Sequence, residues 1–120
     1  MNILIVEDEP TSLKLAHVVM ETEGYSVQNS DTAEKALESI KKQKPQVILL
    51  DLALPGMSGL ELARILKANP ETRNIPIVAI TFYPNRFKRE EALAAGCDAY
   101  VVKPVNTRDL PNLVGEIINK

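Results

Sequence analysis

Four apolar runs of the sequence are each followed by side chains that can take part in chemistry. Glu7 and Asp8 place two carboxylates after the first run, and a longer apolar run ends on Asp51. Two later runs end on the hydroxyl of Thr81 and on the amine of Lys103. If these positions meet in the fold, two carboxylates about 5 Å apart repel by about 3 kcal/mol at an effective dielectric of about 20. Such a cluster needs a cation.

A cluster that offers only oxygen ligands favours a hard divalent cation. Mg²⁺ takes one or two carboxylates, keeps bound waters and accepts phosphate oxygens, so we expect Mg²⁺ as the cofactor. The charge of Lys103 and the hydroxyl of Thr81 would complete a binding site for a phosphoryl group. An aspartate nucleophile, a divalent ion and a lysine are what in-line phosphoryl transfer to a carboxylate requires.

Hydrophobic periodicity predicts the elements that must position these side chains. Short apolar runs indicate strands at 2–6, 25–29, 47–50, 77–80 and 99–102. Apolar residues spaced three or four apart indicate helices at about 10–23, 31–44, 59–69, 85–95 and from 106–109 onward. Ser30 or Asp31 is the expected cap of the second helix, and Gly96 is the expected left-handed stop of the fourth.

The strict alternation of strands and helices predicts an α/β fold, with a parallel five-stranded sheet and helices on both faces. The carboxyl ends of parallel strands meet at one edge, which is where open α/β sheets bind their ligands. The reactive side chains all follow strands, so this edge should collect them. A chain of 120 residues fits one domain with a single core, and we expect one domain over residues 1–120.

Composition restricts the function further. The 14 basic and 16 acidic residues give a net charge of −2 with no long run of either sign, which argues against nucleic acid or a membrane as the partner. Cys97 is the only cysteine, so an internal disulfide and a multi-cysteine zinc site are excluded. The first residues lack a signal-peptide pattern, and a cytoplasmic location is therefore expected.

Five ordered motifs give the chain a family resemblance. They are Val6-Glu7-Asp8-Glu9, the run from Leu49 to Gly59, the strand end at Thr81, the run from Gly96 to Tyr100, and Lys103-Pro104. Over residues 2–119 the sequence resembles the receiver domain of two-component response regulators. This resemblance implies a doubly wound, flavodoxin-like sheet of order 2-1-3-4-5. It also implies that a sensor histidine kinase or a histidine phosphotransfer protein phosphorylates Asp51.

The resemblance implies a role for each residue of the predicted metal site. Asp51 is similar to the phosphoacceptor, whose carboxylate also binds the metal. Asp8 resembles the other direct carboxylate ligand, and Glu7 resembles an acidic neighbour that acts through water. Ala53 occupies the position whose backbone carbonyl reaches the ion. Glu7 replaces an aspartate often found at its position, which lengthens the reach to the metal.

Three further residues resemble the phosphoryl-binding and switching groups of the family. Lys103, expected before a cis Pro104, is similar to the lysine that pairs with the phosphoryl group. Thr81 and Tyr100 resemble the switch pair, in which the hydroxyl moves toward the phosphoryl group and the ring turns inward. Each also has a plainer interpretation: Lys103 as a surface lysine, Thr81 as a helix cap, and Tyr100 as a static aromatic of an outer strand.

The residues after Thr81 depart from the family pattern. Phe82 stands where the family usually has Ala or Gly, and its ring is expected to narrow access to Asp51. Tyr83 and Phe87 add two rings within the same loop. We expect at least one of the three rings to be exposed and to form a partner surface, unless all three pack locally on the fourth helix.

Other classes of function fit the same residues less well. A haloacid-dehalogenase-like phosphatase would need a second acid where Ala53 stands. A flavin or nucleotide binder would need backbone N–H donors after the first strand, where Glu7 and Asp8 would repel a phosphate. A receiver-shaped module that is never phosphorylated remains open.

We therefore expect a stand-alone receiver, which is a phosphorylation-controlled switch and not an enzyme beyond its own phosphotransfer and dephosphorylation. Its signal would leave through a downstream protein, bound by the surface of the fourth helix, fifth strand and fifth helix, or through a second histidine protein in a relay. The alternative is a receiver taken from a longer protein.

Overall fold

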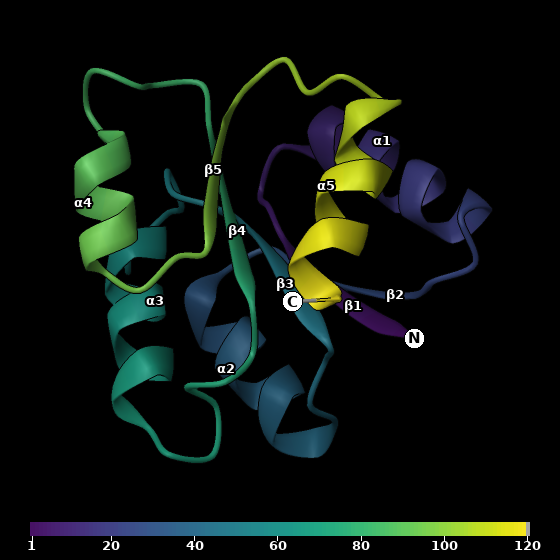
Figure 1. The fold of residues 1–120 in the computed structure, drawn as a ribbon. Helices are drawn as coiled ribbons and strands as arrows, with labels where there is room; N and C mark the ends of the chain where they lie inside the picture. The colour runs from purple at the N-terminus through teal and green to yellow at the C-terminus, as the bar shows by residue number, and fades with distance from the viewer. Residues whose placement is uncertain (120) are drawn as a thin grey trace.

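The structure, a computed structural model, describes residues 1–119. Its strands are β1 (Asn2–Val6), β2 (Ser26–Ser30), β3 (Val47–Asp51), β4 (Ile77–Thr81) and β5 (Ala99–Val102). Its helices are α1 (Pro10–Thr22), α2 (Ala33–Lys42), α3 (Gly59–Ala68), α4 (Arg89–Ala94) and α5 (Asp109–Ile118). The strands form one parallel sheet in the order β2-β1-β3-β4-β5 (Figure 1). The predicted doubly wound α/β fold of order 2-1-3-4-5 is confirmed.

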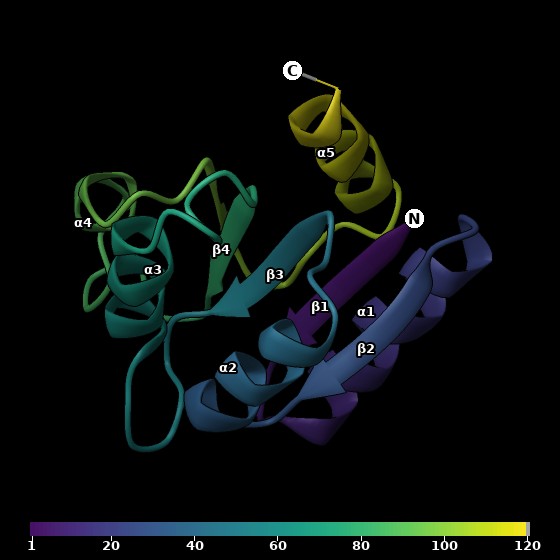
Figure 2. The same cartoon turned by 90° about the horizontal axis from the view of Figure 1, so that it is seen from below.

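The helices cover both faces of the sheet, with α1 and α5 on one side and α2, α3 and α4 on the other (Figure 2). Two apolar layers fill the space between helices and sheet. One layer packs Met20 and Val114 against Leu49, and the other packs Leu62 against Leu50. Successive residues of β3 therefore face opposite layers, and all five are buried.

The register of the sheet places the reactive side chains beside one another. Val6 of β1 pairs with Leu50 of β3, so the next residues in the two strands, Glu7 and Asp51, meet at the carboxyl edge. In the same way Thr81 pairs with Val102 of β5, directly before Lys103. The predicted gathering of strand ends follows from this parallel register.

Helix α4 is shorter than predicted, because the expected helix over 85–95 begins only at Arg89. The residues before it form a turn, in which the N–H of Phe87 donates to the carbonyl of Tyr83 at 2.9 Å. Phe87 is buried in the core under this turn, and Lys88 then adopts extended backbone angles. The extended backbone of Lys88 is what prevents a continuous helix from residue 85, because a helix cannot run through that conformation.

The predicted cap of α2 was also wrong. Thr32 caps this helix, since its hydroxyl accepts from the N–H of Lys35 at 3.0 Å. Ser30 instead ends β2, where its carbonyl accepts from the N–H of Glu7 at 2.9 Å, and Asp31 pairs with Lys35.

Gly96 has the expected left-handed angle, with φ of 103°. Among residues 1–119, no helix combines the length and apolar character that a membrane span requires.

Gly59 lies where α3 begins against the end of β3. Its N–H donates to the carbonyl of Leu52 at 3.0 Å, and the preceding Ser58 caps the helix. A Cβ atom at Gly59 would collide with the backbone carbonyl oxygen of Asp51 and with the Cα of Leu52. The close approach of this turn to Asp51 therefore depends on the missing side chain.

We expect Gly59→Ala to lower the free energy of unfolding by about 1–3 kcal/mol, because backbone atoms must move to admit the methyl group. Urea denaturation measures this change. Gly115→Ala is the matched control, since a Cβ atom there meets nothing within 4 Å. This second change should be neutral or stabilise α5 by up to about 1 kcal/mol. Equal stability of the two variants would contradict the close approach at Gly59.

Candidate functional site

Three carboxylates meet at the carboxyl edge of the sheet. Glu7, Asp8 and Asp51 each offer one oxygen, and these oxygens all lie within 4.8 Å of one another. Glu7 and Asp51 are buried, whereas Asp8 is exposed. The structure thus brings together the acidic residues that the strand ends predicted. Their donor set consists of carboxylate oxygens alone, which suits a hard divalent cation.

The two carboxylate oxygens of Asp51 have different partners. Oδ1 accepts from the backbone N–H of Ala53 at 2.9 Å. Oδ2 lies 3.3 Å from the Nζ of Lys103. The hydrogen bond within the turn fixes the rotation of the carboxylate, and Oδ2 therefore stays directed toward the lysine.

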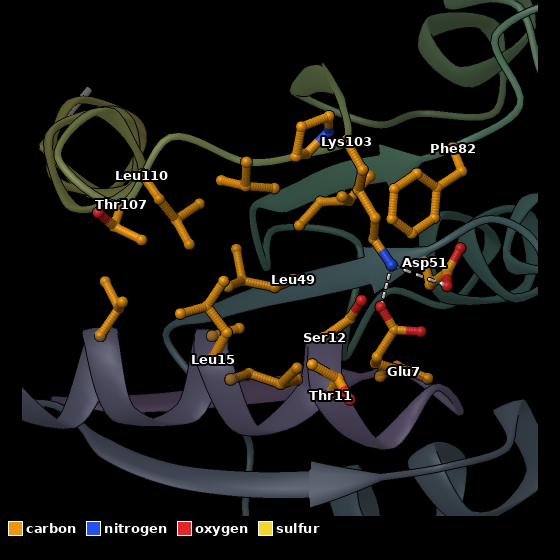
Figure 3. Close-up of a pocket in the computed structure, with 17 residues that line it drawn as sticks. Glu7, Thr11, Ser12, Leu15, Leu49, Asp51, Phe82, Lys103, Thr107 and Leu110 are labelled. Atoms are coloured by element: carbon orange, nitrogen blue, oxygen red, sulfur yellow. Dashed lines mark hydrogen bonds and ion pairs between the residues drawn. The ribbon is translucent and has the colours of Figure 1, made fainter.

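Lys103 is buried and shared between two carboxylates, because its ammonium group pairs with Glu7 as well as with Asp51 (Figure 3). It follows β5 and precedes a cis peptide bond to Pro104, as the resemblance implied. One ammonium group thus faces two buried carboxylates. Removing a partner from such a group leaves a buried charge uncompensated.

The pKa of the Glu7 carboxyl is raised to about 7, first by burial and then by a hydrogen bond shared with the neighbouring Asp51. The ion pair with Lys103 and the N–H of Glu9 act in the opposite direction. The net rise in pKa shows that the lysine offsets only part of the combined effect of burial and of the neighbouring Asp51.

Ala53 lines an open hollow beside the acidic residues. Asp8, Asp51, Phe82 and Lys103 line the same hollow. Ala53 therefore lies next to the carboxylates, and its N–H orients Asp51. Sequence reasoning had assigned only the carbonyl of this residue.

Thr81 and Tyr100 lie on neighbouring strands and are joined through the β4–α4 loop. Thr81 is fully buried, and its hydroxyl oxygen accepts from the N–H of Tyr83 at 2.9 Å. The carbonyl of Tyr83 accepts from the N–H of Phe87, and the hydroxyl of the half-buried Tyr100 donates to the carbonyl of Phe87. A continuous series of hydrogen bonds therefore links the two predicted switch residues, which sequence reasoning did not foresee.

The three rings after Thr81 do not act as one surface. Phe82 and Tyr83 are 50% and 54% exposed, so the expectation of at least one exposed ring is correct. Phe87 was wrongly included in that surface, because it is only 6% exposed and packs in the core with Ala92. The presence of three rings in the loop does not tell which of them is buried. That depends on which ring the folded loop directs into the core, and this ring is Phe87.

Phe82 contacts the site directly. The Nζ of Lys103 lies 4.8 Å from the centroid of its ring, within the range of a cation–π interaction. The ring also lines the hollow that holds Asp51. Figure 3 shows the ring beside Lys103 and Asp51. A residue that departs from the family pattern is thus placed against the lysine, a contact that the sequence alone did not indicate.

The raised pKa of Glu7 makes stability depend on pH. Its native carboxyl binds a proton that the unfolded chain releases near pH 4.5, so this stabilisation is complete below about pH 4.5 and is lost as the pH rises through about 7. With chelator present, Glu7→Gln should match wild type at about pH 4.5 and exceed it by on the order of 2 kcal/mol at about pH 8. Urea denaturation at several pH values checks this. A difference between the two proteins that does not change with pH would contradict the buried carboxyl pair.

Comparisons with known proteins agree with this geometry. The sequence matches the response regulator receiver domain family over residues 3–115. The polar-differentiation response regulator DivK of Brucella anthropi is 34% identical over 105 residues, which cover 88% of this chain and 85% of DivK.

Solved structures are similar over almost the whole chain. A putative response regulator from Chloroflexus aurantiacus has a TM-score of 0.94 and 28% identity, with 99% of this chain and 98% of that chain covered. The receiver domain of a sensor histidine kinase from Pseudomonas aeruginosa has a TM-score of 0.91 and 29% identity at the same coverage, and it holds a magnesium ion in its active site cleft. The fold, the carboxyl-edge acids and the match over residues 3–115 together show that this chain belongs to the response regulator receiver domain family.

Proposed function

We propose that the chain is a phosphorylation-controlled switch in which Asp51 accepts a phosphoryl group from a sensor histidine kinase or a histidine phosphotransfer protein. The observation that carries this proposal is the setting of the Asp51 carboxylate. One oxygen is held by the N–H of Ala53, and the other faces the ammonium group of Lys103. The carboxylate is thus oriented, paired with a cation and adjacent to further acids, as phosphoryl transfer to an aspartate requires.

Mg²⁺ fits the oxygen ligands of this site, and a similar receiver domain holds magnesium in its active site cleft. Asp8, Asp51 and the carbonyl of Ala53 would hold the ion directly, with Glu7 acting through water. When bound, the ion supplies positive charge that offsets the carboxylates and the incoming phosphoryl oxygens.

The nucleophile in this proposal is Oδ2 of Asp51, the oxygen that the turn leaves free. It forms a bond to phosphorus as the bond from phosphorus to the donor nitrogen breaks, and the donor histidine keeps the electron pair of that bond. The ammonium group of Lys103 lies beside Oδ2 and stabilises the negative phosphoryl oxygens. Lys103 must loosen its pairing with Glu7 to do so.

The hydrogen bonds of the β4–α4 loop support a route for the switch. The oxygen of the Thr81 hydroxyl accepts from Tyr83, so its proton can be donated to a phosphoryl oxygen. Movement of Thr81 toward that oxygen would pull on Tyr83 and, through the Phe87 peptide, on the Tyr100 hydroxyl. Phosphorylation would then favour a second arrangement of Tyr100.

The output in this proposal is a protein partner, with no direct role for nucleic acid or membrane. The surface formed by α4, β5 and α5 carries two exposed apolar side chains, Leu93 and Val102, at 42% and 44% exposure. Tyr83 lies in the loop that leads to α4 and is also exposed. These side chains give a downstream protein or a second histidine protein an apolar contact near the switch. The rival function, a receiver-shaped module that is never phosphorylated, predicts no transfer to Asp51.

Asp51→Asn should abolish acid-labile phosphate incorporation from acetyl phosphate with millimolar Mg²⁺, while the circular dichroism spectrum stays that of the wild type. The reason is that the amide cannot attack phosphorus as a carboxylate does. Phosphate labelling and intact mass measure the incorporation. Asp31→Asn is the matched control, since Asp31 is exposed and pairs only with Lys35 on the surface, and it should label normally. Labelling that persists in Asp51→Asn would move the phosphorylation site elsewhere.

Phe82→Ala should speed phosphorylation by acetyl phosphate several-fold, which corresponds to on the order of 1 kcal/mol in the barrier. The expected cause is wider access to Asp51, because the ring lines the hollow that leads to this carboxylate. Stopped-flow kinetics at matched Mg²⁺ measures the rate.

Phe82→Leu separates access from the contact with Lys103. Leucine keeps most of the bulk and loses the cation–π interaction, so its rate should stay close to that of the wild type if access is what matters. A Phe82→Ala protein that reacts no faster than the wild type would show that the ring does not obstruct the donor.

A further inference from the structure

A cavity of about 160 Å³ lies between α1 and α5, next to the phosphorylation site (Figure 3). Its walls are mostly apolar, and they include Leu15, Ala16, Val19, Leu49, Val105 and Leu110. Glu7, Asp51 and Lys103 form one end of it, and Asp51, Phe82 and Lys103 also line the open acidic hollow. The cavity therefore adjoins the proposed phosphoryl site at this end, while its apolar walls extend away from that site between α1 and α5.

Packing explains why the cavity is found at this end of the two helices. Met20 and Val114 are fully buried and fill the space between the sheet and the later turns of α1 and α5. Smaller side chains line the same space nearer the carboxyl edge of the sheet, namely Ser12 and Ala16 of α1 and Thr107 in the loop before α5. Leu15 lies at the mouth and is 48% exposed. The space is thus underfilled and open to a small molecule.

Size and polarity restrict what can enter. A cavity of about 150 Å³ lined by leucine, isoleucine and phenylalanine side chains is known to hold one benzene ring, whereas a helix or a peptide needs far more room. The apolar walls favour an uncharged body. An anion is disfavoured because the charged end of the cavity already has two carboxylates facing one ammonium group.

We propose that this cavity is a binding site for a neutral, single-ring apolar molecule. Binding depends on the walls between α1 and α5, and it does not require that Asp51 be phosphorylated. Failure of the phosphorylation experiments would therefore leave this site untouched, and failure of binding would leave the proposed phosphotransfer untouched.

Benzene is the probe, and thermal unfolding of the full chain is the measurement. Because benzene would bind the native state alone, saturating benzene should raise the unfolding midpoint of the wild type by roughly 2–5 °C. Chemical-shift changes at methyl groups of Leu15, Val19 and Leu110 should accompany the shift in midpoint and give a dissociation constant on the order of 1 mM. Benzoate, which has the same ring and a negative charge, should produce at most a tenth of the benzene effect at equal concentration.

Two variants fill the cavity from different positions. Ala16→Leu adds three carbon atoms within the cavity. Leu15→Phe replaces a leucine at the half-exposed mouth with a bulkier aromatic side chain. Both should remove the benzene response, and Leu15→Phe keeps the test valid if Ala16→Leu does not fold. Val18→Leu enlarges an exposed side chain of α1 that does not line the cavity, so its response should equal that of the wild type. No response in the wild type, or an equal response in the filled variants, would overturn the proposal.

Discussion

The sharing of one ammonium group between two buried carboxylates is the interaction on which the carboxyl edge depends. Lys103 follows β5 and joins the ends of β1 and β3 to it, because its partners Glu7 and Asp51 follow β1 and end β3. Neither acid could be buried beside the other without it, since two desolvated like charges repel strongly. The raised pKa of Glu7 shows that the compensation is incomplete. A bound cation would offset the remaining cost, because an opposite charge nearby favours the ionised form of a carboxylate.

The sheet supplies the rigidity that this interaction needs. Every residue of β3 and β4 is buried, and the parallel register fixes which strand ends lie side by side. Gly59 then lets α3 start against the backbone of Asp51, so the turn after β3 approaches closely and presents the N–H of Ala53. The orientation of one carboxylate thus results from strand pairing, a missing side chain and a short turn acting together.

Much of this architecture could be predicted from the sequence for a physical reason. Apolar runs define the strands, and parallel strands place their ends at one edge, so Glu7, Asp51, Thr81 and Lys103 were expected at that edge. Glu7, Asp51 and Lys103 are in contact there, and Thr81 ends the neighbouring β4. The start of α4 was less predictable, because burial of Phe87 depends on core residues distant in the sequence. The contact between Phe82 and Lys103 and the cavity between α1 and α5 were not predictable either. Both depend on side-chain volumes that come together only in three dimensions.

The link between Thr81 and Tyr100 runs through peptide groups of the β4–α4 loop and uses no loop side chain as an intermediate. Most residue types can supply a backbone N–H or carbonyl, so the exposed side chains at 82 and 83 can change in identity without interrupting this path. In such a loop the backbone carries the switch and the exposed side chains form the recognition surface, so mutation can change the surface while the switch is kept. Duplicated copies of such a domain could therefore diverge toward new partners while every copy transmits the same internal movement.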